Sequence, residues 1–135
     1  MKKILVGFDG SDGSEQALNR AMMLLDDYGI LYLLAVIPGL SDKAFIDDDM
    51  YKTMKRKAQN LINGVIADIG THSFEVEGMI EEGDPAAIII DMANRLNVEL
   101  IVLGSKGQSE LGQYLIGSVA NKVVQYAAKP VMVVR

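Results

Sequence analysis

The residues best suited to chemistry form a glycine-rich stretch between residues 104 and 118. They follow the spacing Gly104-x2-Gly107-x9-Gly117-Ser118, with Lys106 inside the stretch. Glycines allow positive φ and a close approach of the backbone to a bulky anion, so successive amides can point at phosphate oxygens. We expect Gly117 and Ser118 to open a helix, where unpaired N–H groups and the positive end of the dipole face the same anion. The pattern predicts a phosphate site, although a strand-to-helix loop with turn-forming glycines and Ser118 as N-cap explains it equally well.

Two further candidates end other apolar runs. Asp9 follows the first run, where a carboxylate could accept hydrogen bonds from a ribose or help to hold a cation that bridges phosphates; a helix cap or Asx-turn is its alternative role. Val36 ends the second run and could offer backbone groups to a base edge, but its residue type fits the core equally well. The acidic run 47–49 suggests a divalent-metal site, although contiguous acids at a helix start more often favour the helix dipole.

These candidates are positioned by a chain whose apolar pattern alternates between two periods. Unbroken apolar runs predict strands buried on both faces at 4–8, 30–37, 100–103 and 131–134. Alternation over 73–80, with Phe74, Val76 and Ile80 opposite Glu75 and Glu77, predicts a half-exposed edge strand. Apolar residues at steps of three and four predict helices that begin at Ser11 or Asp12, after the polar segment 39–49, at Asp84-Pro85 and near Gly117.

The order β-α-β-α-β-α-β-α-β predicts an α/β fold, a three-layer α/β/α domain that spans residues 1–135. In such folds ligands bind beyond the carboxyl ends of the strands. We therefore expect the site at residues 9–14, at 36–39 and from 104 onward. The single histidine, His72, precedes a strand and so lies at the opposite edge of the sheet, where we expect it to be solvated.

Composition excludes several classes of function. The chain has 135 residues, 13 of them basic and 18 acidic, for a net charge of −5, which argues against nonspecific binding to nucleic acid or anionic membranes. Without cysteine there is no thiolate chemistry, disulfide framework or cysteine-ligated metal. Residues 100–135 nevertheless hold four basic residues and one acidic residue, a local balance that weakly favours an anionic ligand.

The remaining sequence signals concern location and familiar catalytic motifs. The longest apolar run, 30–37, is far shorter than a membrane span, and the apolar stretch at the start is too short for a signal peptide, so we expect a cytoplasmic protein. Neither a Gly-x-Ser-x-Gly elbow, a Walker pattern nor Gly-x-Gly-x-x-Gly occurs in the chain. We therefore expect no serine hydrolase, no P-loop hydrolase and no ordinary dinucleotide-binding domain, and we name no catalytic residue.

The glycine-serine pattern resembles the nucleotide-binding motif Gly-x2-Gly-x9-Gly-Ser/Thr of the universal stress protein family. Residues 3–11 are similar to that family's opening and residues 129–135 to its closing strand, so the resemblance covers the whole chain as a single copy. It implies a five-stranded parallel sheet of order 3-2-1-4-5, Rossmann-like and of the adenine nucleotide alpha hydrolase-like kind. It also implies a homodimer paired through the last strand, which would otherwise be an exposed edge.

The same resemblance implies roles for individual residues. Asp9 and the backbone at Val36 would contact adenosine; Gly104, Lys106 and Gly107 would line the ribose and phosphates; Gly117, Ser118 and Val119 would hold the terminal phosphates. The implied ligand is ATP, or ADP or AMP, with Mg²⁺ or Mn²⁺ as the accompanying cation. Two positions depart from the family's pattern: Ala120 replaces a hydroxyl residue that some ATP-binding members have, and Gly7 replaces a common proline.

The leading hypothesis is an adenine-nucleotide-binding regulatory switch in the stress response, acting on a protein partner that the sequence does not name. One alternative is an enzyme that slowly hydrolyses ATP or transfers phosphoryl groups, although no residue clearly suits the role of general base. A second alternative is an α/β interaction module that binds no nucleotide. A phosphorelay receiver domain shares the alternating topology, but the third strand ends in Glu81-Glu82 without a phosphoacceptor aspartate.

Overall fold

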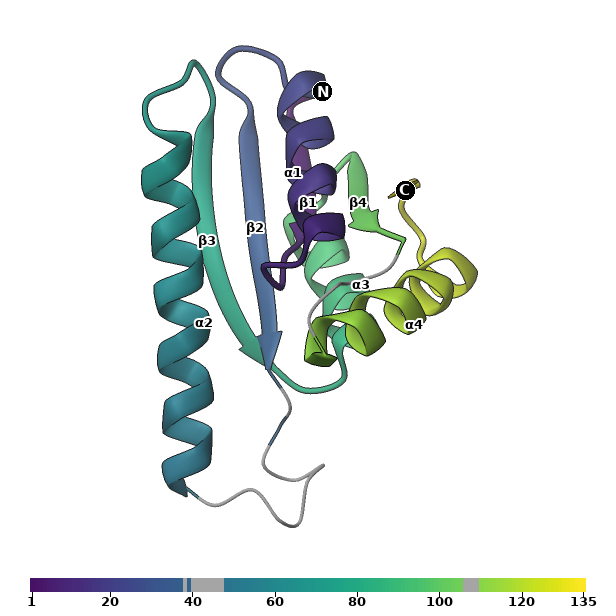
Figure 1. The fold of residues 1–135 in the computed structure, drawn as a ribbon. Coiled ribbons are helices and arrows are strands. Elements are labelled where there is room, and N and C mark those ends of the chain that lie inside the picture. Colours follow the sequence, from purple (N-terminus) through teal and green to yellow (C-terminus); the bar gives the residue numbers. More distant parts are fainter. Residues whose placement is uncertain (38, 40–47, 106–109) are drawn as a thin grey trace.

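The computed structural model describes residues 1–37, 39, 48–105 and 110–135, with the side chains of residues 110–116 excepted. Strands and helices alternate along the chain (Figure 1): β1 (Lys3–Gly7), α1 (Asp12–Leu24), β2 (Ile30–Ile37), α2 (Asp48–Ile69), β3 (Glu75–Glu82), α3 (Pro85–Leu96), β4 (Leu100–Gly104), α4 (Glu110–Tyr126) and β5 (Val131–Val134). The predicted order of elements is confirmed.

The strands form one parallel sheet of order β3-β2-β1-β4-β5. This is the order that the sequence resemblance implies. The central strand β1 is paired on both sides, with Leu5 opposite Tyr32 of β2 and Ile101 of β4. Because all strands run in one direction, their carboxyl ends share one edge of the sheet, and β1, β2 and β4 end there.

Two helical layers cover the sheet, α1 and α2 on one face and α3 and α4 on the other (Figure 1). Successive residues of β1 point to opposite faces. Ile4 and Val6 are therefore buried under α1 and α2, and Leu5 is buried under α3 and α4. Each fully buried aliphatic side chain of this kind contributes about 1.5–3 kcal/mol to folding. Burial on both faces explains why the central strands read as unbroken apolar runs.

The edge strand β3 has the two-sided character predicted for it. Phe74, Val76 and Ile80 pack against the core under α1 and α2, whereas Glu75 and Glu77 are exposed on the other face. Met79, on the same face as these two glutamates, packs against the core under α3 and α4. No helix in the described part of the chain is both long and apolar enough to cross a membrane.

Polar caps begin the helices where the sequence predicts them. Ser11 is the N-cap of α1, and its Oγ accepts a hydrogen bond from Ser14 N at 3.2 Å. Asp84 caps α3, with Oδ2 accepting from Ala87 N at 3.0 Å and proline in the first helical position. The first turn of α2 contains two residues of the acidic run, Asp48 and Asp49, which agrees with the helix-dipole explanation; Asp47 lies outside the described residues.

The predicted start of the fourth helix near Gly117 is wrong. Helix α4 begins at Glu110 and runs to Tyr126, so Gly117 and Ser118 lie within it. Residues 110–116 contain no proline and several good helix formers, and a glycine in a helix interior costs only about 1 kcal/mol relative to alanine. Helix α4 therefore continues through Gly117, the residue near which the sequence predicts its start.

Candidate functional site at the carboxyl edge of the sheet

The structure brings two of the predicted site residues to one cavity. Asp9, which follows β1, and Val36, near the end of β2, both line a cavity of about 30 Å³ beneath Pro85 and Ile89 of α3. A cavity of this size has room for water but not for an adenine ring. Gly104, Gly117, Ser118 and Val119 are all described, and none of them lines it.

Asp9 uses one carboxylate oxygen to shape the turn between β1 and α1. Its Oδ1 accepts a hydrogen bond from Ser11 N at 2.9 Å, which is the Asx-turn considered from the sequence. The same turn contains Gly10 at φ +84°, a left-handed conformation that favours glycine. The other oxygen, Oδ2, is buried and has no hydrogen-bond partner among the described residues. Buried polar atoms are normally satisfied, so Oδ2 is an acceptor suited to a donor from a ligand or from water.

Ser14 completes this turn; it lies within the expected site range 9–14, but the sequence assigned it no individual role. It is fully buried, its Oγ donates to Ser11 O at 2.9 Å, and it accepts from Asp9 N at 3.4 Å. Pro85 and Ile89 of α3 are also absent from the sequence-predicted site. The Asp84-Pro85 cap was the available signal, because a helix that follows a parallel strand begins at the carboxyl edge of the sheet.

Val36 offers its backbone at this edge. Hydrogen bonds from Ile30 N to Lys2 O and from Phe8 N to Leu34 O show that even-numbered residues of β2 direct their backbone groups toward β1. The register between the two strands ends at Gly7 and Leu34. The N–H and C=O groups of Val36 therefore lie past the end of that ladder, on the side of the cavity.

The glycine-serine stretch is only partly assembled as predicted. Gly104 is buried at the end of β4 against the backbone of α1. Val119 is buried in the core under α3 and α4, Ser118 is exposed, and Gly117 is half-buried. All three lie well inside α4 and not at its start, where their amides take part in helix hydrogen bonds. Their contact with phosphate stays a prediction. Lys106 and Gly107 lie outside the described residues.

The locally basic segment 100–135 does not form one cluster at this edge. Lys129 precedes β5 and therefore lies at the amino edge of the sheet, where its Nζ donates to Asn97 Oδ1 at 2.6 Å.

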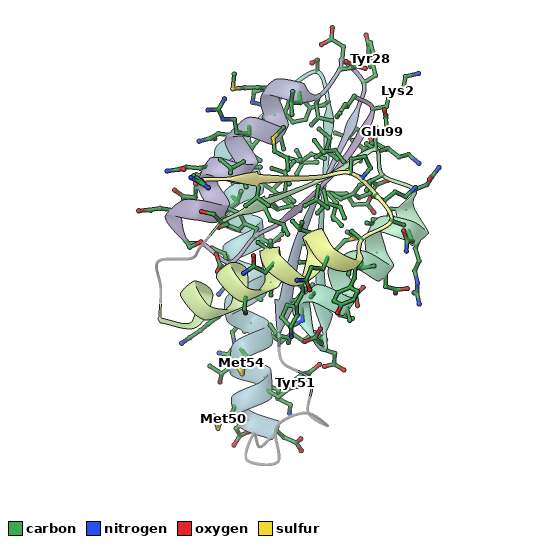
Figure 2. All side chains as sticks on the ribbon, turned by 90° about the vertical axis from the view of Figure 1, so that its right-hand side faces the viewer. Lys2, Tyr28, Met50, Tyr51, Met54 and Glu99 are labelled. Atoms are coloured by element: carbon green, nitrogen blue, oxygen red, sulfur yellow. The ribbon has the colours of Figure 1, made fainter. Side chains whose placement is uncertain are left out.

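At the carboxyl edge, the Tyr51 hydroxyl is hydrogen-bonded to Glu82, and this bond raises the pKa of Tyr51. Figure 2 shows Tyr51 near the start of α2, at the opposite end of the molecule from Tyr28. No three histidine, aspartate or glutamate side chains of the described residues gather to hold a metal ion.

Comparison with known proteins identifies the fold that carries this site. The sequence profile described as Universal stress protein family matches residues 1–135. The chain belongs to the universal stress protein family. Universal stress protein YxiE of Bacillus subtilis (strain 168) is 29% identical over 145 residues, covering 98% of each chain. The solved structure of hypothetical protein MJ0577 has a TM-score of 0.80 at 29% identity, covering 98% of this chain and 94% of that one.

Two further solved structures with this fold contain adenine nucleotides. One is a universal stress protein in complex with cAMP, 23% identical, with a TM-score of 0.69 over 99% of this chain and 97% of that one. The other is a universal stress protein family protein from Arabidopsis thaliana, At3g01520, with AMP bound. It is 17% identical, with a TM-score of 0.68 over 99% of this chain and 91% of that one.

Proposed function

We propose that this universal stress protein binds an adenine nucleotide at the carboxyl edge of its sheet and acts as a nucleotide-responsive regulatory domain, spanning residues 1–135, in the cytoplasm. The observation that carries the proposal is Asp9 Oδ2, buried and without a partner among the described residues, at the same cavity as Val36, which lies past the end of the β1–β2 register. The cAMP and AMP complexes of proteins with this fold support the choice of an adenine nucleotide.

The nucleoside end of the ligand would use the two residues at the cavity. A ribose hydroxyl is a donor suited to Asp9 Oδ2, and the N–H and C=O groups of Val36 are suited to the edge of a base. Because the cavity of about 30 Å³ is smaller than adenine, binding requires the ligand to lie over its mouth or the start of α3 to shift.

The phosphate end would lie along the glycine-serine stretch. Gly104, Lys106 and Gly107 would line the ribose and phosphates, and Gly117, Ser118 and Val119 the terminal phosphates, with Mg²⁺ or Mn²⁺ accompanying ATP. Amide contacts from residues 117–119 require α4 to begin later in the bound state than at Glu110. Faster amide hydrogen exchange in residues 111–116 on nucleotide addition is the expected sign of that change.

The nucleotide proposal is tested by titrating ATP, ADP and AMP, with and without Mg²⁺, into nucleotide-free protein by calorimetry. Asp9→Asn keeps an oxygen acceptor for Ser11 N but removes the charge, so we expect binding about tenfold weaker or worse. Gly117→Val should also weaken binding. Gly64→Val is the matched control, because a Cβ at Gly64 of α2 meets nothing within 4 Å. Absence of binding by the native chain, or equal binding by all variants, overturns the proposal.

We also propose that the chain forms a homodimer through β5. This strand ends the sheet, its Val133 is 38% exposed, and a groove of about 430 Å³ separates it from Arg20 and the 75%-exposed Met23 of α1. An apolar edge of this kind is suited to pairing with a second copy. Light scattering should give a dimer mass for the native chain and a monomer mass for Val133→Lys. Thr71→Lys, an exposed loop variant with the same change of charge, should stay dimeric; a monomeric native chain contradicts the proposal.

A further inference from the structure

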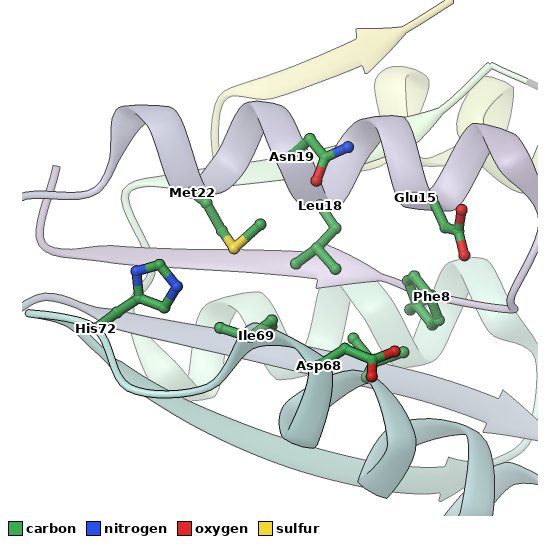
Figure 3. Close-up of a pocket in the computed structure, with 9 residues that line it drawn as sticks. Phe8, Glu15, Leu18, Asn19, Met22, Asp68, Ile69 and His72 are labelled. Carbon is green, nitrogen blue, oxygen red and sulfur yellow. The ribbon is translucent and has the colours of Figure 1, made fainter.

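A hollow larger than the Asp9 cavity lies on the face of the sheet covered by α1 and α2, in the trough between these two helices (Figure 3). Its volume is about 310 Å³, at the lower end of the range of small-molecule pockets, about 300–1,000 Å³. The cavity beside Asp9 instead lies on the side of the sheet covered by α3. Among the described residues that line them, the two hollows share Phe8 alone, so the trough is distinct from the cavity of the proposed nucleotide site.

The trough exists because the two helices cover different strands. Helix α1 packs on β1, β4 and β5, whereas α2 packs on β2 and β3, and the helices have little direct contact with each other. Phe8 and Leu18 form a nearly buried floor beneath the gap. Met22, Val65 and Ile69 form half-buried walls, so the gap offers apolar surface that neither helix covers.

The polar side chains around this apolar surface are Glu15, Asn19, Asp68 and His72, two of which are carboxylates. Figure 3 shows Glu15 of α1 and Asp68 of α2 at the end of the trough beside Phe8, while His72 lies at the end beside Met22. Both carboxylates are exposed, and no lysine or arginine is among the described residues that line the trough. The site thus combines apolar walls with two negative charges at one end.

We propose that this trough binds a small organic cation, a primary ammonium group on a flat or aliphatic apolar body. The body would contact Met22, Val65 and Ile69, gaining free energy from burial of apolar area. The ammonium group would lie between Glu15 and Asp68, which attract a cation and repel a carboxylate or phosphate. A ligand that has only one of these two parts would satisfy only half of the site. The proposal is independent of nucleotide binding at the carboxyl edge.

The test compares three probes of matching size: 2-phenylethylamine, neutral 2-phenylethanol and anionic 3-phenylpropionate. Each is titrated into the ¹⁵N-labelled full chain at pH 7, and amide shifts are followed by NMR. The amine should shift residues of α1 and of the second half of α2, the alcohol should bind at least about tenfold more weakly, and the acid should not bind.

Variants of the trough separate its two parts. The double variant Glu15→Gln, Asp68→Asn should weaken amine binding about tenfold and leave alcohol binding unchanged. Asn19→Trp, an exposed position on the wall of the trough, should block both probes by filling the space. Glu77→Gln is the matched control, an exposed acid on the opposite face of the sheet, and should change neither. Equal binding of amine and alcohol, shifts outside the trough, or no binding by any probe overturns the proposal.

Discussion

Gly104 at the end of β4 lies against the backbone of Gly13 in the first turn of α1. A Cβ atom on Gly104 would stand 2.6 Å from the Gly13 carbonyl carbon and 2.7 Å from its oxygen. Real Cβ atoms do not approach backbone this closely, so the strand and the helix could not keep their present contact. The first glycine of the glycine-serine pattern therefore has a packing role that holds whether or not a phosphate lies nearby.

Gly104→Ala should accordingly lower the free energy of unfolding by about 1–3 kcal/mol, the usual cost of overpacking a close contact. Urea unfolding followed by circular dichroism measures the change. Gly64→Ala is the control: its Cβ enters open space on α2, and alanine is the better helix former, so stability should rise by about 0.5–1 kcal/mol. Unchanged stability of Gly104→Ala would show that α1 shifts away without cost.

Tyr28 adopts a backbone conformation that its residue type does not favour. It has φ 66° although its side chain is 92% exposed, so little packing offsets the strain. Asparagine tolerates this region better and stands at φ 52° in the cap of α3, at Asn97. Tyr28→Asn should raise the free energy of unfolding by up to about 1 kcal/mol. Tyr28→Phe keeps the strain and should change nothing; a clear loss in Tyr28→Asn would contradict the explanation.

The cap of α3 makes a contribution that can be measured alone. Asp84 is exposed, and its side chain accepts a hydrogen bond from Ala87 N at 3.0 Å. Asp84→Ala should reduce stability by about 1 kcal/mol because it leaves that N–H without its partner. Asp84→Ser keeps an oxygen acceptor and should restore most of the loss. If Asp84→Ala unfolds like the native chain, the cap does not stabilise the helix.

Ionisation of Tyr32 should lower the free energy of unfolding at high pH. Burial raises the pKa of its hydroxyl above the ordinary value of 10.0, and the carboxylates of Glu77 and Glu75 raise it further. The folded protein therefore holds this proton more tightly than the unfolded chain. The resulting stability is fully present below pH 10 and is lost as the pH rises from there through the higher folded-state pKa.

Tyr32→Phe removes this titration, so its free energy of unfolding should fall less between pH 9 and pH 11 than that of the native chain. Urea unfolding at steps of half a pH unit measures both curves. Tyr126→Phe is the control for loss of a tyrosine hydroxyl, since the Tyr126 side chain is 73% exposed. Parallel curves for Tyr32→Phe and the native chain would contradict the assignment.

Most of the fold can be predicted from the sequence because its signals are local. Apolar periodicity identifies the elements, and the caps at Ser11 and Asp84 begin two helices where the structure has them. Helix α4 is the exception. Gly117 carries no side chain that contradicts a helix start, so the choice between starting there and passing through depends on preceding residues and on packing against the sheet.

The candidate site, like the fold, has features that follow from the sequence and others that depend on tertiary packing. The sequence alone predicts that Asp9 and Val36 lie at one edge of the sheet, because both stand at the carboxyl ends of parallel strands, and its two-period pattern predicts the layers. Only the tertiary structure decides that Asp9 Oδ2 has no partner among the described residues and that Gly104 contacts Gly13. It also decides that Lys129 binds Asn97 at the far edge and that a hollow separates α1 from α2. These features depend on distances between elements that are remote in the chain. Such distances are determined by how side chains fill the space between layers, which no local pattern records.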